Sequence, residues 1–357
     1  MEHDLKGKRL LVTGGAGFIG SAFVRAALAA GVERLVVLDK LTYAAHPANL
    51  ARPAQDPRFD LVVGDVADAA DCRAALEAAR PDWVVHLAAE SHVDRSIEDP
   101  APFLRTNVLG TGVLLDACLE HLDGRPEADR AGFRFLHSST DEVFGELEGG
   151  DHADEQRAYS PSSPYSATKA AADHLVRAYG RTYGLPWILT HSGNNYGPRQ
   201  FPEKLVPLAL GRLLAGEAVP LYGDGEHERD WIHVEDHCRA LLAAGLRGTP
   251  GRAYCVSAGE VRSNRDLVEL LRGVCEGGEA GSVEFVSDRP GHDRRYALDP
   301  SRLREETAWT AHTGLAEGLA ATVRWYRDHP EWVAEAQERS GYRGERLGLG
   351  RRPGRPR

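Results

Sequence analysis

A glycine-rich loop near the N-terminus constrains the fold of this chain more than any other feature. Residues 9–12 form a short apolar run, the loop Thr13-Gly14-Gly15-Ala16-Gly17-Phe18-Ile19-Gly20 follows at once, and a helical pattern covers residues 21–30. A strand, a tight glycine loop and a helix in this order bring a pyrophosphate to the N-terminus of the helix. The glycine spacing G-x-x-G-x-x-G is a variant of the commoner dinucleotide fingerprint and obeys the same physics. The loop therefore predicts an α/β fold with a doubly wound parallel sheet of the Rossmann type.

The end of the second expected strand favours NAD as the dinucleotide. This strand, at 35–38, ends in Asp39. A carboxylate about 20 residues beyond the fingerprint binds the ribose hydroxyls of NAD, and it repels the 2′-phosphate of NADP. Lys40 weakens that repulsion slightly, and a simple turn cap is the alternative interpretation of Asp39. Strands expected at 60–63 and 83–87 end in Gly64-Asp65-Val66 and Ala88-Ala89-Glu90-Ser91-His92, where small residues allow a cofactor to approach the backbone.

Two adjacent carboxylates follow the next expected strand. The apolar run at 133–136 leads into Ser138-Ser139-Thr140-Asp141-Glu142-Val143-Phe144-Gly145. Ligands of an open α/β sheet lie beyond the carboxyl ends of its strands, so Thr140, Asp141 and Glu142 are candidate substrate-site residues. Neighbouring carboxylates can divide into an acid and a base where their surroundings separate their pKa values. Taken alone, the pair is equally consistent with a solvated turn.

A tyrosine and a lysine on a later helical pattern strengthen the catalytic interpretation. Tyr165 and Lys169 stand four residues apart at the start of the helix expected over 166–183. Residues at this spacing share one face of a helix. A lysine charge near a phenol is expected to lower the pKa of the phenol, which would make Tyr165 a general base for a hydroxyl that loses hydride. The motif is weak by itself, but the upstream glycine loop and hydroxyl cluster make chance a poor explanation.

Composition excludes several classes of protein. The chain has 357 residues, 42% apolar content and a formal net charge of −10, which is typical of a soluble globular protein and argues against a nucleic-acid partner. Its five cysteines lack CxxC spacing, so we expect buried thiols in a cytoplasmic protein, with no metal site and no disulfide framework. No leader or stretch long enough to span a bilayer is present, so no membrane partner is expected. Residues 343–357 are basic and are predicted to be a disordered tail.

The glycine loop and the Tyr165–Lys169 pair resemble the extended short-chain dehydrogenase/reductase superfamily, and the closer resemblance is to the dTDP-glucose 4,6-dehydratases. It extends from residue 9 to about residue 330. The Thr140-Asp141-Glu142 triplet is its most specific part, because relatives that epimerise or decarboxylate nucleotide sugars are not expected to carry both acids. His191 stands where the family often has arginine, and Ala45-His46-Pro47 replaces a more usual Gly-Asn-type loop. The segments that carry the resemblance are LDKLTYA (38–44), LAAESHVDRSI (87–97), STDEVFG (139–145), SPYSATKA (163–170), NNYGPRQFPEKL (194–205), VPLYGDG (219–225), RDWIHVEDHC (229–238) and DRPGHDRRYALD (288–299).

The resemblance implies an NAD-dependent lyase that converts dTDP-glucose to dTDP-4-keto-6-deoxyglucose. Tyr165, helped by Lys169 and Thr140, would take the proton of the C4 hydroxyl while hydride passes from C4 to NAD. Glu142 would then remove the C5 proton. Protonated Asp141 would protonate the C6 hydroxyl that leaves as water. The hydride would return to C6 and regenerate the cofactor.

The resemblance also implies two sets of binding residues, which overlap at the sugar. The cofactor set is Gly14, Gly17, Phe18, Ile19, Gly20, Asp39, Lys40, Leu41, Thr42, Asp65, Val66, Leu87, Ala88, Ala89, Ser91, Thr106, Tyr165, Lys169 and Asn195. The substrate set is Ser91, Thr140, Asn194, Lys204, Leu205, Pro220, Leu221, Tyr222, Arg229, Asn264, Asp288, Arg289, Pro290, Gly291 and His292. The cationic and amide members would hold the diphosphate, and residues 220–222 would form the base pocket.

The domain organisation expected from the same resemblance is interleaved. Residues 1–190, with a return segment near 231–259, would form the NAD-binding domain, and residues 191–230 and 260–335 would form the sugar-nucleotide lobe. A homodimer through the helices at 102–122 and 166–183 is expected. Two alternatives stay open. The first is a nucleotide-sugar 4-epimerase or decarboxylase, which the acid pair disfavours. The second is a non-catalytic NAD-binding scaffold, which the intact catalytic pairs disfavour. The sequence leaves open the choice between thymidine and uridine nucleotides.

Overall fold

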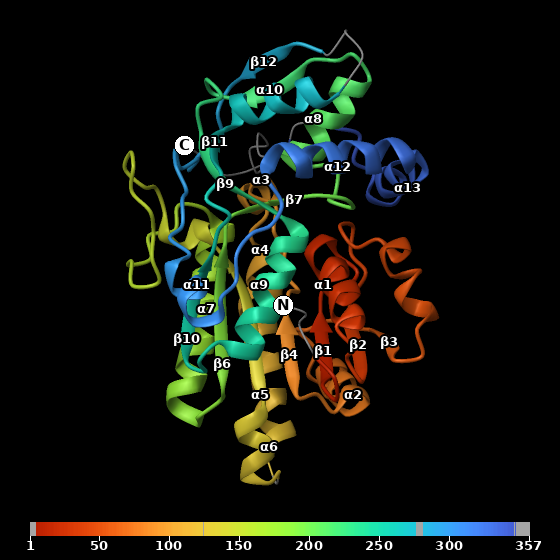
Figure 1. Ribbon diagram of the computed structural model, residues 1–357, viewed down its shortest axis with the longest axis vertical. Helices are drawn as coiled ribbons and strands as arrows, with labels where there is room; N and C mark the ends of the chain where they lie inside the picture. Colours follow the sequence, from red (N-terminus) through yellow and green to blue (C-terminus); the bar gives the residue numbers. More distant parts are fainter. Residues whose placement is uncertain (1–4, 124, 276–280, 346, 348–357) are drawn as a thin grey trace.

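A central sheet of seven parallel strands organises the fold (Figure 1). The computed structural model describes residues 5–123, 125–275, 281–345 and 347. The strands follow the order β10-β6-β5-β4-β1-β2-β3, and each neighbouring pair is parallel. The predicted α/β class with a doubly wound parallel sheet is confirmed. The strands are β1 (Arg9–Thr13), β2 (Arg34–Asp39), β3 (Phe59–Val63), β4 (Trp83–His86), β5 (Arg134–Thr140), β6 (Trp187–Ser192) and β10 (Arg252–Val256).

Helices cover both faces of this sheet, which is why its central strands are continuous apolar runs. One face packs on α1 (Phe18–Ala29), α9 (Val234–Arg247) and α11 (Ser301–Thr307). The other packs on α2 (Ala69–Ala79), α5 (Thr111–Leu122) and α7 (Pro164–Tyr183). The helix expected over 102–122 is a composite, because a π-helical segment, η3 (Leu104–Gly110), joins α4 (Ala101–Phe103) to α5. Shorter elements are η1 (Pro47–Leu50), η2 (Pro53–Gln55), α3 (Val93–Glu98), α6 (Glu127–Gly132) and η4 (Asp141–Phe144).

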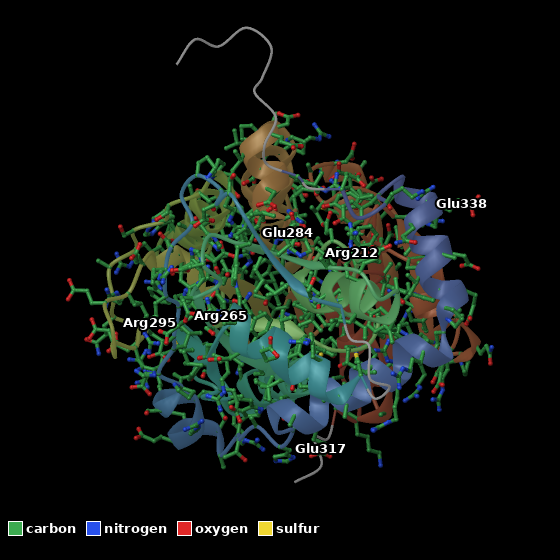
Figure 2. All side chains as sticks on the ribbon, turned by 90° about the horizontal axis from the view of Figure 1, so that it is seen from above. Arg212, Arg265, Glu284, Arg295, Glu317 and Glu338 are labelled. Atoms are coloured by element: carbon green, nitrogen blue, oxygen red, sulfur yellow. The ribbon has the colours of Figure 1, made fainter. Side chains whose placement is uncertain are left out.

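A smaller lobe stands above the carboxyl ends of the strands, at the top of Figure 1. It contains a three-stranded sheet, β11-β9-β7, and a two-stranded sheet, β12-β8, around a separate apolar core. Seen from above, its outer surface carries many charged side chains, including Arg212 of α8, Arg265 of α10, Glu317 of α12 and Glu338 of α13 (Figure 2). The elements are β7 (Asn194–Tyr196), β8 (Val219–Tyr222), β9 (Glu228–His233), β11 (Val261–Ser263), β12 (Val283–Val286), α8 (Leu205–Leu214), α10 (Asn264–Val274), α12 (Leu315–Asp328) and α13 (Pro330–Ser340).

The chain crosses between the two parts more than once. After β9 it returns through α9 to β10, which pairs with β6 at the edge of the large sheet. All five cysteines are buried and free, which confirms the expectation of buried thiols. Within the described residues, no helix combines the length and apolarity needed to cross a bilayer.

Candidate active site

The glycine loop is shaped by close contacts between backbone segments. Gly14 has φ +72°, and a Cβ there would lie 2.7 Å from the backbone of Ala88 at the end of β4. A Cβ on Gly20 would lie 2.0 Å from the carbonyl oxygen of Gly14. Gly17 is the N-cap of α1 and contributes no side-chain hydrogen bond. The N-terminal N–H groups of α1 are therefore left for an anion, and the loop fits the pyrophosphate of a dinucleotide.

Asp39 lies beside this loop, at the end of β2. Its Oδ2 accepts a hydrogen bond from Ala16 N at 2.9 Å, and its Oδ1 accepts one from Leu41 N at 2.8 Å. Burial raises the pKa of Asp39, and the two backbone hydrogen bonds and then Lys40 oppose that rise. The carboxylate thus braces the glycine loop and the turn at Leu41, where φ is +54°, while it also lines the cofactor pocket. Both the ligand interpretation and the cap interpretation fit this geometry.

Most of the expected cofactor residues line one continuous pocket at the carboxyl ends of the strands. Leu41, Asp65 and Thr106 are the exceptions, and Thr106 instead accepts a hydrogen bond from Lys40 Nζ at 2.8 Å. The expected cofactor residues in the pocket are Gly14, Gly17, Phe18, Ile19, Gly20, Asp39, Lys40, Thr42, Val66, Leu87, Ala88, Ala89, Ser91, Tyr165, Lys169 and Asn195. Thr140, Asp141 and Glu142 line the same pocket, so the structure brings the expected catalytic set to the cofactor side.

The acid pair sits in the turn η4, directly after β5. The strand continues through Thr140, four residues beyond the apolar run at 133–136, and Thr140 Oγ1 then caps the turn by accepting from Glu142 N at 3.3 Å. Burial raises the pKa of Asp141 well above its usual range, and the Glu142 and Asp230 carboxylates raise it further. Burial and the neighbouring carboxylates therefore both favour the protonated form of Asp141.

Glu142 has different surroundings from its neighbour. Burial raises its pKa, but the cations of Arg289, Arg229 and Lys204 oppose that rise. The structure therefore places one carboxyl group among carboxylates and the next among cations. Two neighbouring carboxyl groups that are to act as an acid and a base need such a separation of environments.

Tyr165 and Lys169 stand in the first turns of α7. The helix begins with a capping box at Ser163, and Pro164 follows at its first position. Lys169 Nζ donates to the carbonyl oxygen of Ser138 on β5 at 2.8 Å, and burial lowers the pKa of this ammonium to about 8. The expected fall in the pKa of Tyr165 is wrong for this structure. Burial, followed by the charge of Glu142, raises the pKa of Tyr165, and a hydrogen bond with Thr140 opposes the rise without overcoming it.

A second pocket adjoins the first and extends into the small lobe. The two share Ser91, Glu142, Asn194, Glu203 and Lys204. The second pocket contains most of the expected substrate set, namely Ser91, Asn194, Lys204, Leu205, Pro220, Leu221, Tyr222, Arg229, Asn264, Arg289 and His292. Thr140 lines only the first pocket, and Asp288, Pro290 and Gly291 line neither.

Buried carboxylates orient the polar side chains of this second pocket. Asp94 Oδ2 accepts from Tyr222 OH at 2.7 Å, and its Oδ1 accepts from Arg289 Nη1 at 2.9 Å. Glu203 accepts from Arg95 Nε at 2.8 Å and from Tyr43 OH at 3.2 Å. Asp94 and Glu203 thus join the large sheet's loops to the small lobe across the cleft.

Several lining residues were missed by sequence reasoning. Asp94, Glu203 and Tyr342 carry no motif that would single them out, although Asp94 and Glu203 lie inside segments that resemble the dehydratases. Gly344, Glu345 and Leu347, in the segment expected to be a disordered tail, also line the second pocket. Residues 346 and 348–357 of that segment lie outside the described residues.

His227, Asp288 and His292 form a cluster beside the second pocket, which His292 lines. His227 Nε2 lies 3.1 Å from Asp288 Oδ2, and His292 Nδ1 lies 2.7 Å from Asp288 Oδ1. The two imidazole rings are stacked, with centroids 3.7 Å apart and an interplanar angle of 11°. A metal ion bound by both nitrogens would have to lie in both ring planes, and parallel planes at this separation do not allow that. The cluster instead holds His292 against Asp288.

Comparison with known proteins places this geometry in a family. Residues 11–322 match the family model described as GDP-mannose 4,6 dehydratase. The dTDP-glucose 4,6-dehydratase of Xanthomonas campestris pv. campestris (strain B100) is 46% identical over 349 residues, which cover 95% of this chain and 98% of the relative.

Solved structures agree with the sequence comparison. The crystal structure of DesIV, a dTDP-glucose 4,6-dehydratase from Streptomyces venezuelae with NAD bound, aligns with a TM-score of 0.85 at 44% identity, covering 92% of this chain and 99% of that one. A UDP-glucose 4-epimerase from Thermus thermophilus in complex with NAD aligns with a TM-score of 0.81 at 34% identity, covering 89% of this chain and 99% of that one.

The parallel sheet, its glycine loop and the Tyr165–Lys169 pair at one pocket define an extended short-chain dehydrogenase/reductase. Within that class the epimerase shares the fold, while the acid pair and the identity over nearly the whole chain point to the dehydratases. The chain belongs to the dTDP-glucose 4,6-dehydratase family, whose members are hydro-lyases.

Proposed function

We propose that this chain uses NAD to remove water from dTDP-glucose and forms dTDP-4-keto-6-deoxyglucose. One observation carries the proposal, namely the placement of a protonated Asp141 next to a cation-facing Glu142 on the pocket that holds Tyr165 and Lys169. Elimination of water across C5 and C6 needs one acid and one base on the same substrate. The relatives named above support the thymidine nucleotide over the uridine nucleotide.

The residues divide the work of the reaction as follows. Tyr165, hydrogen-bonded to Thr140, receives the proton of the C4 hydroxyl. Lys169 stands one turn further along the same helix, where a positive charge would favour the phenolate. Glu142 takes the C5 proton once C4 is a ketone, and Asp141 donates its proton to the departing C6 oxygen. NAD would supply the acceptor for the C4 hydride and, once reduced, the hydride for C6. Glu142 would then return its proton to C5, which completes the 4-keto-6-deoxy sugar. Lys204, Arg229 and Arg289 hold the diphosphate.

The sharpest test separates oxidation from elimination. The purified protein is given dTDP-glucose, and separately UDP-glucose, and the 4-keto product is followed by its absorbance in alkali. In single turnovers, Asp141→Asn and Glu142→Gln should still pass hydride from C4 and accumulate NADH, with little 4-keto-6-deoxy product. Glu148→Gln, at an exposed carboxylate nearby, is the matched control and should behave as wild type.

Three outcomes of these measurements would contradict the proposal. If both acid variants dehydrate the sugar at rates near wild type, the pair is not the elimination apparatus. Formation of a C4 epimer in place of a 4-keto-6-deoxy sugar would favour the 4-epimerase alternative. Turnover that needs no nicotinamide, or release of mainly NADP(H) on denaturation, would contradict the cofactor.

A homodimer and a cytoplasmic location are part of this proposal. Leu104 and Leu109 of η3 and Tyr183 of α7 are large apolar side chains with exposed fractions of 54%, 52% and 56%. They lie on the helices at 102–122 and 166–183 that are expected to form the interface, and a second copy would cover them. Leu109→Arg should yield a monomer in sedimentation equilibrium, while Leu214→Arg, at an exposed leucine of α8, should leave the dimer intact. A monomeric wild type would contradict the interface.

A further inference from the structure

The catalytic face of α7 continues past Tyr165 and Lys169 to a buried carboxylate that the mechanism above does not use. Asp173 stands one further turn along, and residues spaced by four share a helix face. Its exposed fraction is 0%. A buried carboxylate is costly unless it is paired, so the groups around Asp173 show what it contributes.

Three elements besides α7 surround Asp173. Ser139 Oγ on β5 donates to Asp173 Oδ2 at 2.8 Å, and Tyr159 OH, in the segment before α7, donates to the same oxygen at 3.0 Å. His137 Nε2 on β5 lies 3.2 Å from Oδ1, and His191 Nε2 on β6 lies 3.4 Å from Oδ2. Burial opposes the ionisation of Asp173, but its contacts with the two histidines outweigh burial and hold its pKa below the usual range. The carboxylate is therefore charged at neutral pH.

The charge of Asp173 acts on several neighbours, and Lys169 is one of them. Burial lowers the pKa of His137 to about 4, so that ring is neutral. Arg177, one turn beyond, donates to Tyr159 OH at 3.1 Å. For Lys169, the Asp173 carboxylate opposes the burial that lowers the ammonium pKa to about 8. The other titratable groups near this cluster include Tyr165 and His174 on α7, His86 beside His137, and Cys255 near Tyr159.

Asp173 and Lys169 also act on the same strand end. Lys169 Nζ binds the carbonyl oxygen of Ser138, and Asp173 binds the hydroxyl of Ser139. Two successive turns of α7 thus hold two successive residues of β5, immediately before the turn that carries the acid pair. Displacing this strand end would move the tyrosine, the lysine and the acid pair relative to one another, and misplacement by about 1 Å can cost ~10²-fold in rate.

We propose that Asp173 is a positioning residue for proton transfer, whose buried charge keeps Lys169 protonated and whose bond to Ser139 holds the end of β5 against α7. The inference rests on the proposed dehydratase function, because Lys169 acts there through Tyr165. The proposal also includes His191, which contacts Asp173 and stands where the family often has arginine. Its Nε2 lies 3.4 Å from Asp173 Oδ2, where an arginine would place a permanent positive charge.

The test is the pH dependence of kcat/KM for dTDP-glucose in wild type and Asp173→Asn. The variant keeps the shape of the side chain and removes its charge. Lys169 should then lose its proton at lower pH, so the alkaline limb moves to lower pH and the loss of activity is roughly threefold or more greater at pH 8 than at pH 6. A purely structural role would lower the rate without moving the alkaline limb, and that result overturns the proposal.

Two further variants keep the test decisive. Tyr159→Phe removes one hydroxyl from Asp173 and leaves the charge, so its alkaline limb should stay in place. Lys169→Arg should abolish the alkaline limb, because arginine does not titrate in this range. A limb that persists near pH 8 in Lys169→Arg overturns the proposal even if Asp173→Asn does not fold. A wild type that fails to dehydrate dTDP-glucose contradicts the proposed function itself, whereas an active wild type with an unmoved alkaline limb in Asp173→Asn contradicts only the role of Asp173.

Discussion

The cofactor side and the substrate side of the cleft are built by different means. On the cofactor side, backbone segments approach one another closely, as Gly14 approaches Ala88, and the loop that does this is a short continuous stretch. On the substrate side, side-chain charges are paired across the two lobes. Asp94 meets Tyr222 and Arg289, which are 128 and 195 residues away in the chain.

This difference predicts which kind of substitution should weaken binding on each side. The cofactor side depends on glycines, whose lack of a side chain lets backbone segments approach closely. An added methyl group should therefore weaken cofactor binding although no charge changes. The substrate side depends on paired charge, so an isosteric change that removes a charge should damage it although no volume changes. Tyr165 lines the cofactor pocket together with Glu142, which lines both pockets. Its loss should lower the rate of the reaction without weakening the binding of cofactor or substrate.

The largest effect is expected from Tyr165→Phe. The ring remains, but the group that accepts the C4 proton is gone, and general base catalysis typically contributes ~10²–10⁴-fold. We expect kcat to fall by that amount while the NAD content of the purified protein is unchanged. Tyr183→Phe, at the exposed end of the same helix, is the control. Steady-state activity within about a factor of two of wild type would remove Tyr165 from the mechanism.

Gly20→Ala should weaken the binding of NAD and leave the substrate side unchanged. Its Cβ would lie 2.0 Å from Gly14 O, and overpacking of this kind costs about 1–3 kcal/mol. NAD affinity should therefore fall roughly tenfold to a hundredfold, as measured by fluorescence titration. Gly112→Ala, where a Cβ meets nothing within 4 Å, should bind NAD as wild type does. An unchanged NAD affinity in Gly20→Ala would show that the loop can relax.

Asp94→Asn should weaken the binding of the substrate and leave the cofactor side unchanged. It keeps the volume and removes the charge that orients Arg289, and hydrogen bonds to charged groups contribute about 1.5–3 kcal/mol. We expect KM for dTDP-glucose to rise about tenfold, with kcat and NAD affinity nearly unchanged. Glu77→Gln, at an exposed carboxylate of α2, serves as the control. A fall in kcat with constant KM would contradict this division of roles.

The smallest effect concerns stability. Because burial raises the pKa of Asp141, the folded protein keeps a proton that the unfolded chain loses above pH ~3.9. Above that pH the acid lowers the stability of the fold, and below it the contribution disappears. Asp141→Asn should therefore raise Tm by roughly 1–3 °C at pH 7, with a smaller gain as the pH falls towards ~4. Calorimetry that shows a lower Tm at pH 7 would contradict the buried, protonated state of Asp141.

Local patterns were enough to predict the scaffold. The apolar runs of the central strands, the glycine loop and the i, i+4 spacing of Tyr165 and Lys169 are each contained in a few consecutive residues, and the structure forms the corresponding strands and helices. The pKa of Tyr165 could not be obtained in this way. It depends on burial and on Glu142, and both follow from the packing of α7 against β5.

By itself, the sequence determined the parallel sheet, the dinucleotide loop and the candidate catalytic side chains, because each follows from local periodicity, turn chemistry or a contiguous motif. Only the tertiary structure decided which of the two acids lies among carboxylates, which lies among cations, and which carboxylates brace the cleft. It also decided that Tyr342, from the far end of the chain, lines the substrate pocket. These properties arise from burial and charge pairing between residues distant in sequence, and such contacts exist only after the two lobes have packed together.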